Sequence, residues 1–194
     1  MNTRDETAGK LFFSIEELKN QGLSNYRINQ WVAEGKLKRL TRTVYENLQF
    51  QGERHEFFYA PVFAPKGIVC LMSAAVFWQL STYRPLAVDV AIPRNRKLYT
   101  LPEWPVFSIH YFDINRHRLG SQVVQTEEQS FSVTDPEKTA LDVLHFKENI
   151  GIEQVREVMA LYLQRKDRDL NKLYNYASKL KTTSILRTYM EMML

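Results

Sequence analysis

The chain has 194 residues, of which 44% are hydrophobic and 12% aromatic, a composition that supports a packed core and excludes a chain disordered throughout. The formal net charge of +4 is compatible with a nucleic-acid partner without requiring one, and a single cysteine excludes a disulfide framework and is typical of a reducing compartment. No stretch of ~20 apolar residues is present and the N-terminus is polar, so we expect a cytoplasmic protein with no membrane partner.

Residues 13–45 begin with the pattern of two short helices joined by a tight turn. Ser14 is suited to cap the first helix, and Glu17, three residues later, is placed to complete a capping box. Gly22 stands where a helix ends with a left-handed residue, because glycine has no Cβ to clash there. Ser24 is suited to cap the second helix. This arrangement predicts a helix-turn-helix.

The second helix is predicted to have one buried and one exposed face. Ile28, Trp31 and Val32 are spaced i, i+3 and i+4, and therefore share its buried face. The outer face near its N-terminal end carries Asn25, Tyr26, Arg27, Asn29 and Gln30. A recognition helix presents that end to base edges, so we predict that these residues contact double-stranded operator DNA.

A basic strand-turn-strand follows, as in the wing of a winged helix-turn-helix. Gly35 ends the helix, Leu37 and Leu40 alternate with polar residues, and residues 41–43 form the predicted turn. The predicted DNA-binding residues of this wing are Lys36, Lys38, Arg39 and Arg42. Together with Arg27 they offer a basic surface for phosphates, which supply much of the affinity for DNA. The alternative is a helical hairpin with a solvated basic strand.

The chain is predicted to divide into two domains. Residues 1–48 form the winged helix-turn-helix DNA-binding domain, residues 49–54 a polar linker, and residues 55–194 a second domain. The elements predicted for the second domain are helices over residues 55–64 and 71–80, strands over 88–93 and 106–112, a hairpin of 123–126 with 130–133 turned at 127–128, a helix from 136 that stops at 149–151, and helices over 152–164, 169–180 and 183–193. The predicted fold class is therefore α+β, with a winged helix-turn-helix followed by a mixed α/β domain and a helical C-terminal tail.

The start of the helix at residue 136 has two interpretations. Asp135 is suited to cap it, Pro136 to occupy its first position, and Glu137 to favour its positive end. Acidic residues beside a lysine also hold the metal in some nucleases, but there the Glu and Lys are one residue apart on a strand. Glu137 and Lys138 are adjacent at a helix start and should point in different directions, which favours the cap.

The other candidates for chemistry are few. The four histidines have no metal-ligand spacing, and neither a phosphate-binding glycine loop nor a serine-hydrolase elbow is present. Cys70 lies in an apolar run and is expected to be a buried, unreactive thiol. We therefore predict no catalytic residue, no metal and no cofactor. Two basic segments, Arg94, Arg96 and Lys97 in one and residues 116–118 in the other, are interpreted as solvated loops, with contact to DNA or a partner as the alternative.

The whole chain resembles the AbiEi-family antitoxins, the DNA-binding half of bacterial AbiE abortive-infection (type IV toxin–antitoxin) systems. The segments that carry the resemblance are residues 14–18, 22–24, 35–37 and 42–45 in the winged helix, and 71–75, 90–93, 135–142 and 150–152 beyond it. The most specific of these is Asp-Pro-Glu-Lys-Thr-Ala-Leu-Asp over residues 135–142. The chain departs from the family at residues 42–44, where many members place a glycine in the wing.

The resemblance implies a non-enzymatic antitoxin in two parts. The winged helix would bind repeats in its own promoter and repress the operon. The second domain would counter a nucleotidyltransferase-like toxin, without a stable complex between the two proteins. The alternative is a transcription regulator whose second domain senses a ligand and has no relation to a toxin. A third hypothesis, a DNA-acting nuclease, is disfavoured because the residues supply no metal-binding set.

Overall fold

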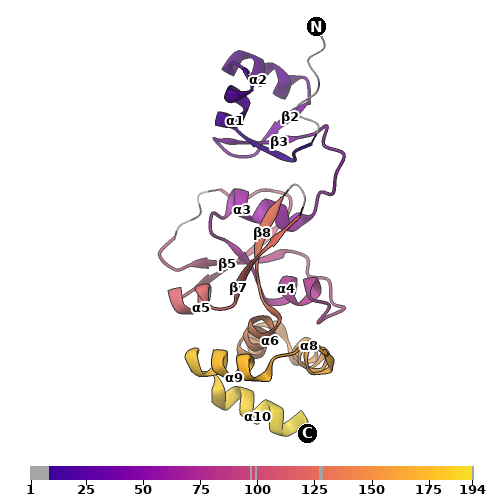
Figure 1. Ribbon diagram of the computed structural model, residues 1–194, viewed down its shortest axis with the longest axis vertical. Helices are drawn as coiled ribbons and strands as arrows, with labels where there is room; N and C mark the ends of the chain where they lie inside the picture. The colour runs from indigo at the N-terminus through magenta and orange to yellow at the C-terminus, as the bar shows by residue number, and fades with distance from the viewer. Residues whose placement is uncertain (1–8, 97, 99, 127–128, 194) are drawn as a thin grey trace.

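The computed structural model describes residues 9–96, 98, 100–126 and 129–193. The protein is α+β and elongated, with a small three-stranded winged helix at one end, a five-stranded mixed sheet in the middle and a group of helices at the other end (Figure 1). The predicted fold class is confirmed. The predicted hairpin turn at residues 127–128 lies outside the described residues.

The winged helix is built from two helices and an antiparallel sheet in the order β1-β3-β2. Its elements are β1 (Phe12–Ser14), α1 (Ile15–Asn20), α2 (Asn25–Ala33), β2 (Leu37–Arg39) and β3 (Val44–Asn47). Both bonds of the predicted capping box form, with the Glu17 amide 3.1 Å from Ser14 Oγ and the Ser14 amide 2.7 Å from Glu17 Oε2. Gly22 takes the left-handed conformation expected of it. β1 was not predicted, because its three residues are too few to show a periodic pattern.

The second sheet has the order β6-β5-β4-β8-β7. Its strands are β4 (Ile68–Val69), β5 (Val88–Pro93), β6 (Phe107–Phe112), β7 (Ser121–Gln125) and β8 (Ser130–Thr134). β4 pairs antiparallel with β5 and parallel with β8, β5 runs parallel to β6, and β7 is antiparallel to β8. Val88, Val90 and Ile92 enter the core cluster that also holds residues 57–60 and 63, so Asp89 and Ala91 lie on the opposite face.

Helices occupy most of the remaining chain. They are η1 (Glu56–Tyr59), α3 (Ala60–Phe63), α4 (Leu71–Phe77), α5 (Ile114–Arg118), α6 (Pro136–His145), α7 (Lys147–Ile150), α8 (Ile152–Gln164), α9 (Leu170–Lys179) and α10 (Thr183–Met193). The helix predicted over residues 55–64 is a 3-10 turn followed by one α-helical turn, because Pro61 has no N–H and is tolerated only at a helix start. The predicted cap of α6 forms, with the Lys138 amide 2.8 Å from Asp135 Oδ1.

The prediction of a solvated basic loop at residues 116–118 is wrong. Asp113 caps the short helix α5, and both Arg116 and His117 are buried. The Arg116 guanidinium is 2.5 Å from the Asp142 carboxylate on α6, and His117 Nε2 is 3.0 Å from a backbone carbonyl oxygen. Burial lowers the pKa of His117. The partners lie far away in the sequence, so a local reading of three basic residues does not reveal them.

A buried polar network joins α6 to α9 at the start of the resemblance motif. Asp135 Oδ2 accepts the Tyr176 hydroxyl at 3.0 Å and lies 3.1 Å from Lys172 Nζ. Burial and the nearby Asp135 carboxylate raise the pKa of Tyr176 to about 12. Glu137 also binds Lys172, at 2.9 Å, whereas Lys138 turns away to Asp142. Asp135 is therefore a helix cap that also fastens a second helix, and Glu137 and Lys138 point to different partners.

The winged helix is fastened to the second sheet through an apolar contact and a buried hydrogen bond. The Phe12 and Tyr59 rings meet edge to face with centroids 5.0 Å apart, and the Tyr59 hydroxyl donates to Glu46 at 2.7 Å. Phe50, in the segment predicted to be a linker, is buried in the same core cluster. The Arg54 guanidinium lies 3.6 Å from Glu46 and donates to the carbonyl oxygen of Phe50 at 3.1 Å. Phe50 and Arg54 thus attach this segment to both units, whereas residues 51–53 are exposed.

Candidate nucleic-acid interface

Helix α2 presents its predicted outer face to solvent. The Arg27 amide donates to Ser24 Oγ at 3.3 Å, which caps the helix as expected. Ile28 is buried, and Trp31 and Val32 are half-buried against the same small core. The outer residues Asn25, Tyr26, Arg27 and Asn29 are exposed, and Gln30 is half-buried. The Tyr26 side chain is 81% exposed, so it offers an aromatic ring with a hydroxyl to any molecule that approaches α2.

Hydrogen bonds along α2 hold its polar side chains in a row. Arg27 Nη1 donates to Gln30 Oε1 at 2.8 Å, and Gln30 Nε2 donates to Glu34 Oε1 at 2.7 Å. Lys36 Nζ lies 2.8 Å from Glu34 Oε2, and this contact lowers the pKa of Glu34. Glu34 is the single acidic residue between Arg27 and Arg42, and its ion pair is with Lys36. Arg27, the cation of α2, forms a hydrogen bond to Gln30 and no ion pair among the described residues.

The wing turn forms without a glycine. Thr41 Oγ1 accepts hydrogen bonds from the backbone amides of Thr43 at 3.3 Å and Val44 at 3.1 Å. Arg39 braces the same turn, because its guanidinium donates to the carbonyl oxygens of Thr41 at 3.2 Å and Arg42 at 3.3 Å. The Thr41 side chain therefore stabilises a tight turn at a position where other chains would use the conformational freedom of a glycine. Arg42 stands exposed at the tip.

The predicted contact residues do not all share one surface. Leu37 packs into the core beneath α2, and successive side chains of a strand point to opposite faces. Arg39 therefore lies on the α2 side of the sheet, where it approaches the Tyr45 ring, whereas Lys38 lies on the other side, opposite Glu46 in the register. The side chain of Lys38 is separated from α2 by the sheet itself.

The wing tip faces the second sheet across a hollow of about 750 Å³. Residues 40–43 line one side of this hollow, and Arg96 with Phe63 lines the other. Arg96, which follows β5, thereby lines the same hollow as Arg42. Arg94 instead reaches the Tyr111 carbonyl oxygen on β6, with Nε 3.5 Å away. The third basic residue of that loop, Lys97, lies outside the described residues.

One further polar group, not predicted from the sequence, lies on β5 and β6. His110 Nε2 lies 2.8 Å from Asp89 Oδ1 and 3.2 Å from Ser108 Oγ. In a serine-hydrolase triad the Ser and the Asp contact opposite ring nitrogens, so this arrangement does not position the histidine as a base for Ser108. The alternation of Ser108 and His110 on one strand was the available signal, but the pairing with Asp89 depends on strand order.

Neither a metal centre nor an exposed thiol is present among the described residues. Among those residues, no three or more His, Cys, Asp or Glu side chains are grouped closely enough to hold a metal ion. Cys70 is buried, and burial raises the pKa of its thiol. None of the described helices has both the length and the apolar character needed to cross a membrane.

Comparisons with known proteins add a structural likeness. No protein-family model matches the chain, and no curated protein matches it. Among solved structures, the chain is similar to the crystal structure of the RV2827C protein from Mycobacterium tuberculosis, with 11% sequence identity and a TM-score of 0.48. The similarity covers 91% of this chain and 74% of that one.

Proposed function

We propose that this protein is a DNA-binding antitoxin that represses its own operon in the cytoplasm and counters a nucleotidyltransferase-like toxin. The observation that carries the DNA-binding part is the exposed N-terminal end of α2, where Arg27, which has no ion pair among the described residues, lies beside Asn25 and Asn29. Polar side chains at that end of a recognition helix suit base edges, and the braced basic wing suits phosphates. The antitoxin part is supported by the resemblance of residues 135–142 to AbiEi proteins.

The DNA-binding part predicts a specific salt dependence. Replacing Arg27 and Arg42 together by alanine should weaken binding to a duplex taken from the region upstream of the gene. The slope of log K against log salt should fall by about 0.9 for each phosphate contact that is lost. Fluorescence anisotropy over a salt titration, with a scrambled duplex in parallel, measures both effects.

Lys38→Ala is the matched control for that titration. It removes one positive charge from the same wing, but on the face of the sheet that is turned away from α2. We expect its salt slope to stay near that of the wild type. The Arg27→Ala single variant, which also removes one charge, is the direct comparison. Equal loss of DNA affinity in Lys38→Ala and in Arg27→Ala would mean that net charge governs binding and that α2 is not the recognition element.

The antitoxin part predicts the outcome of a growth assay. We expect the gene beside this one to encode a nucleotidyltransferase-like protein whose expression alone arrests growth, and co-expression of this chain to restore it. The Arg27/Arg42 double variant should restore growth as well as the wild type does, while a reporter under the upstream promoter loses repression. Rescue that disappears with DNA binding would show that the chain acts only by silencing transcription. An adjacent gene without this toxicity would favour the ligand-sensing regulator instead.

A further inference from the structure

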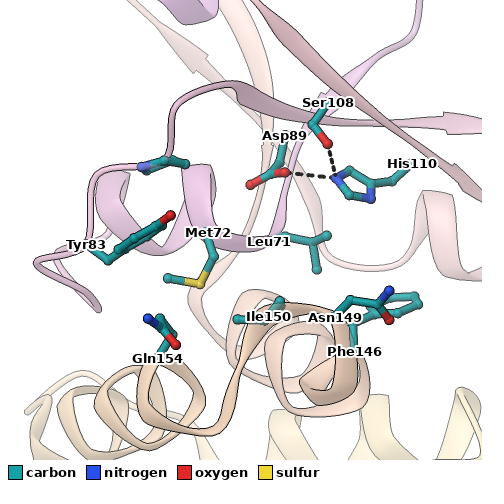
Figure 2. A pocket seen from close by; sticks show the side chains of 11 residues that line it. Leu71, Met72, Tyr83, Asp89, Ser108, His110, Phe146, Asn149, Ile150 and Gln154 are labelled. Carbon is teal, nitrogen blue, oxygen red and sulfur yellow. Dashed lines mark hydrogen bonds and ion pairs between the residues drawn. The ribbon is translucent and has the colours of Figure 1, made fainter.

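A cavity of about 410 Å³ lies between the β5–β6 edge of the second sheet, the start of α4 and the α7–α8 turn. Figure 2 shows Asp89 and His110 along one side, Tyr83 at one end and Phe146 at the other. Leu71 and Met72 from α4 and Ile150 from α7 form apolar walls. Its size is in the range of small-molecule sites, which are mostly apolar with a few convergent polar groups.

The Asp89 carboxylate is the charged centre of this cavity. One oxygen contacts His110 Nε2 at 2.8 Å, and the other accepts from the Ser73 amide at 3.2 Å and lies 3.4 Å from the Ser73 hydroxyl. Its side chain is only 14% exposed. Within the described part of the chain, no lysine or arginine forms an ion pair with it. Its charge-bearing partner is His110, and neutral Ser73 donors hold its other oxygen, so a cation brought from outside would supply a charge that the described lysines and arginines do not.

The other residues that line the cavity also favour a cationic ligand over an anionic one. Of the described residues around it, none is a lysine or an arginine, so a phosphate or carboxylate would meet no countercharge and would face Asp89. Tyr83 adds an aromatic ring, whose face attracts cations. The Phe146 ring already has the Arg116 guanidinium 5.3 Å from its centroid and adds apolar surface. The His110–Asp89 contact fixes the imidazole, and its other ring nitrogen, Nδ1, lies on the side turned away from Asp89 (Figure 2).

We propose that this cavity binds a small organic cation, an ammonium compound with an apolar or aromatic body. Its ammonium group lies at Asp89, and its body lies between Leu71, Met72 and Phe146. The site belongs to the second sheet, and no described residue of the winged helix lines it. It is therefore a ligand site in addition to the proposed DNA-binding function and independent of it.

Three probes with one aromatic body separate charge from shape. Phenethylamine is cationic, 2-phenylethanol is neutral and phenylacetate is anionic at pH 7. Calorimetry on the full chain should give saturable binding of the amine, at least about tenfold tighter than the alcohol, and no saturable binding of the acid. Absence of saturable amine binding at millimolar concentrations, or phenylacetate binding as tightly as the amine, overturns the proposal.

Variants assign the preference to the cavity. Asp89→Asn keeps the shape and should remove the preference for the amine over the alcohol. Glu153→Gln removes the same charge from an exposed position near the start of α8, outside the cavity, and should leave the preference intact. Should Asp89→Asn fail to fold by circular dichroism, Tyr83→Leu decides, because it removes an exposed aromatic ring and should weaken amine binding several-fold more than alcohol binding. An amine preference unchanged from the wild type in folded Asp89→Asn, or in Tyr83→Leu where Asp89→Asn does not fold, refutes the site.

Discussion

Replacing Asp142 by asparagine is expected to lower the free energy of unfolding by about 3–5 kcal/mol, the usual cost of leaving a buried charge without its partner. Asp142 is fully buried and holds two cations, Arg116 from α5 and Lys138 from its own helix α6. Lys138 is itself fully buried and lies over the Phe112 ring. Asparagine fills the same volume but carries no charge, so both cations would remain in the core uncompensated. Urea unfolding followed by circular dichroism measures the loss.

Lys138→Met is the informative comparison. It removes one cation and leaves Asp142 paired one to one with Arg116, while the methionine side chain fills much of the space of the lysine. We therefore expect a clearly smaller loss of stability than for Asp142→Asn. A loss as large in Lys138→Met would mean that packing around the lysine stem, and not charge compensation, stabilises the junction of α5 and α6.

Replacing Phe12 by alanine is expected to lower the free energy of unfolding by about 3–5 kcal/mol and to weaken the attachment of the winged helix to the second sheet. Phe12 packs on Tyr59 in the core cluster that spans both units. Its neighbour Phe13 points to the other face of β1, into the small core of the winged helix with Leu18 and Ile28. Phe13→Ala removes the same ring from the adjacent position and is therefore a matched control.

Hydrogen exchange separates the two effects. In Phe12→Ala, amides of residues 49–59 should exchange faster while α1 and α2 keep their protection, because only the attachment is weakened. In Phe13→Ala, α1 and α2 should lose protection first. Faster exchange of α1 and α2 in Phe12→Ala would show that the winged helix does not hold its structure without the second sheet. The two parts on either side of residues 49–54 would then unfold together and not as separate domains.

Short-range chemistry made much of this fold readable from the sequence. The capping box at Ser14, the cap at Asp135 and the left-handed Gly22 all form as predicted, because each depends on residues three or four positions apart. The strand Val88–Pro93 and the helix Ile152–Gln164 also have the predicted bounds, since their apolar periodicity is uninterrupted. The face of α2 that is exposed follows from the same periodicity.

Only the tertiary structure decided which polar residues are buried and which of them meet. The local sequence predicts a solvated loop at Arg116, but Asp142, 26 positions later, lies beside it and binds it. Asp89 and His110 are 21 positions apart and meet because β5 and β6 are parallel neighbours in one sheet. β1 and β4 are too short to show a period of two and exist only because longer strands pair with them. A charge can be stable in the core only beside its partner, and strand order and helix packing, which local sequence does not encode, bring the partners together.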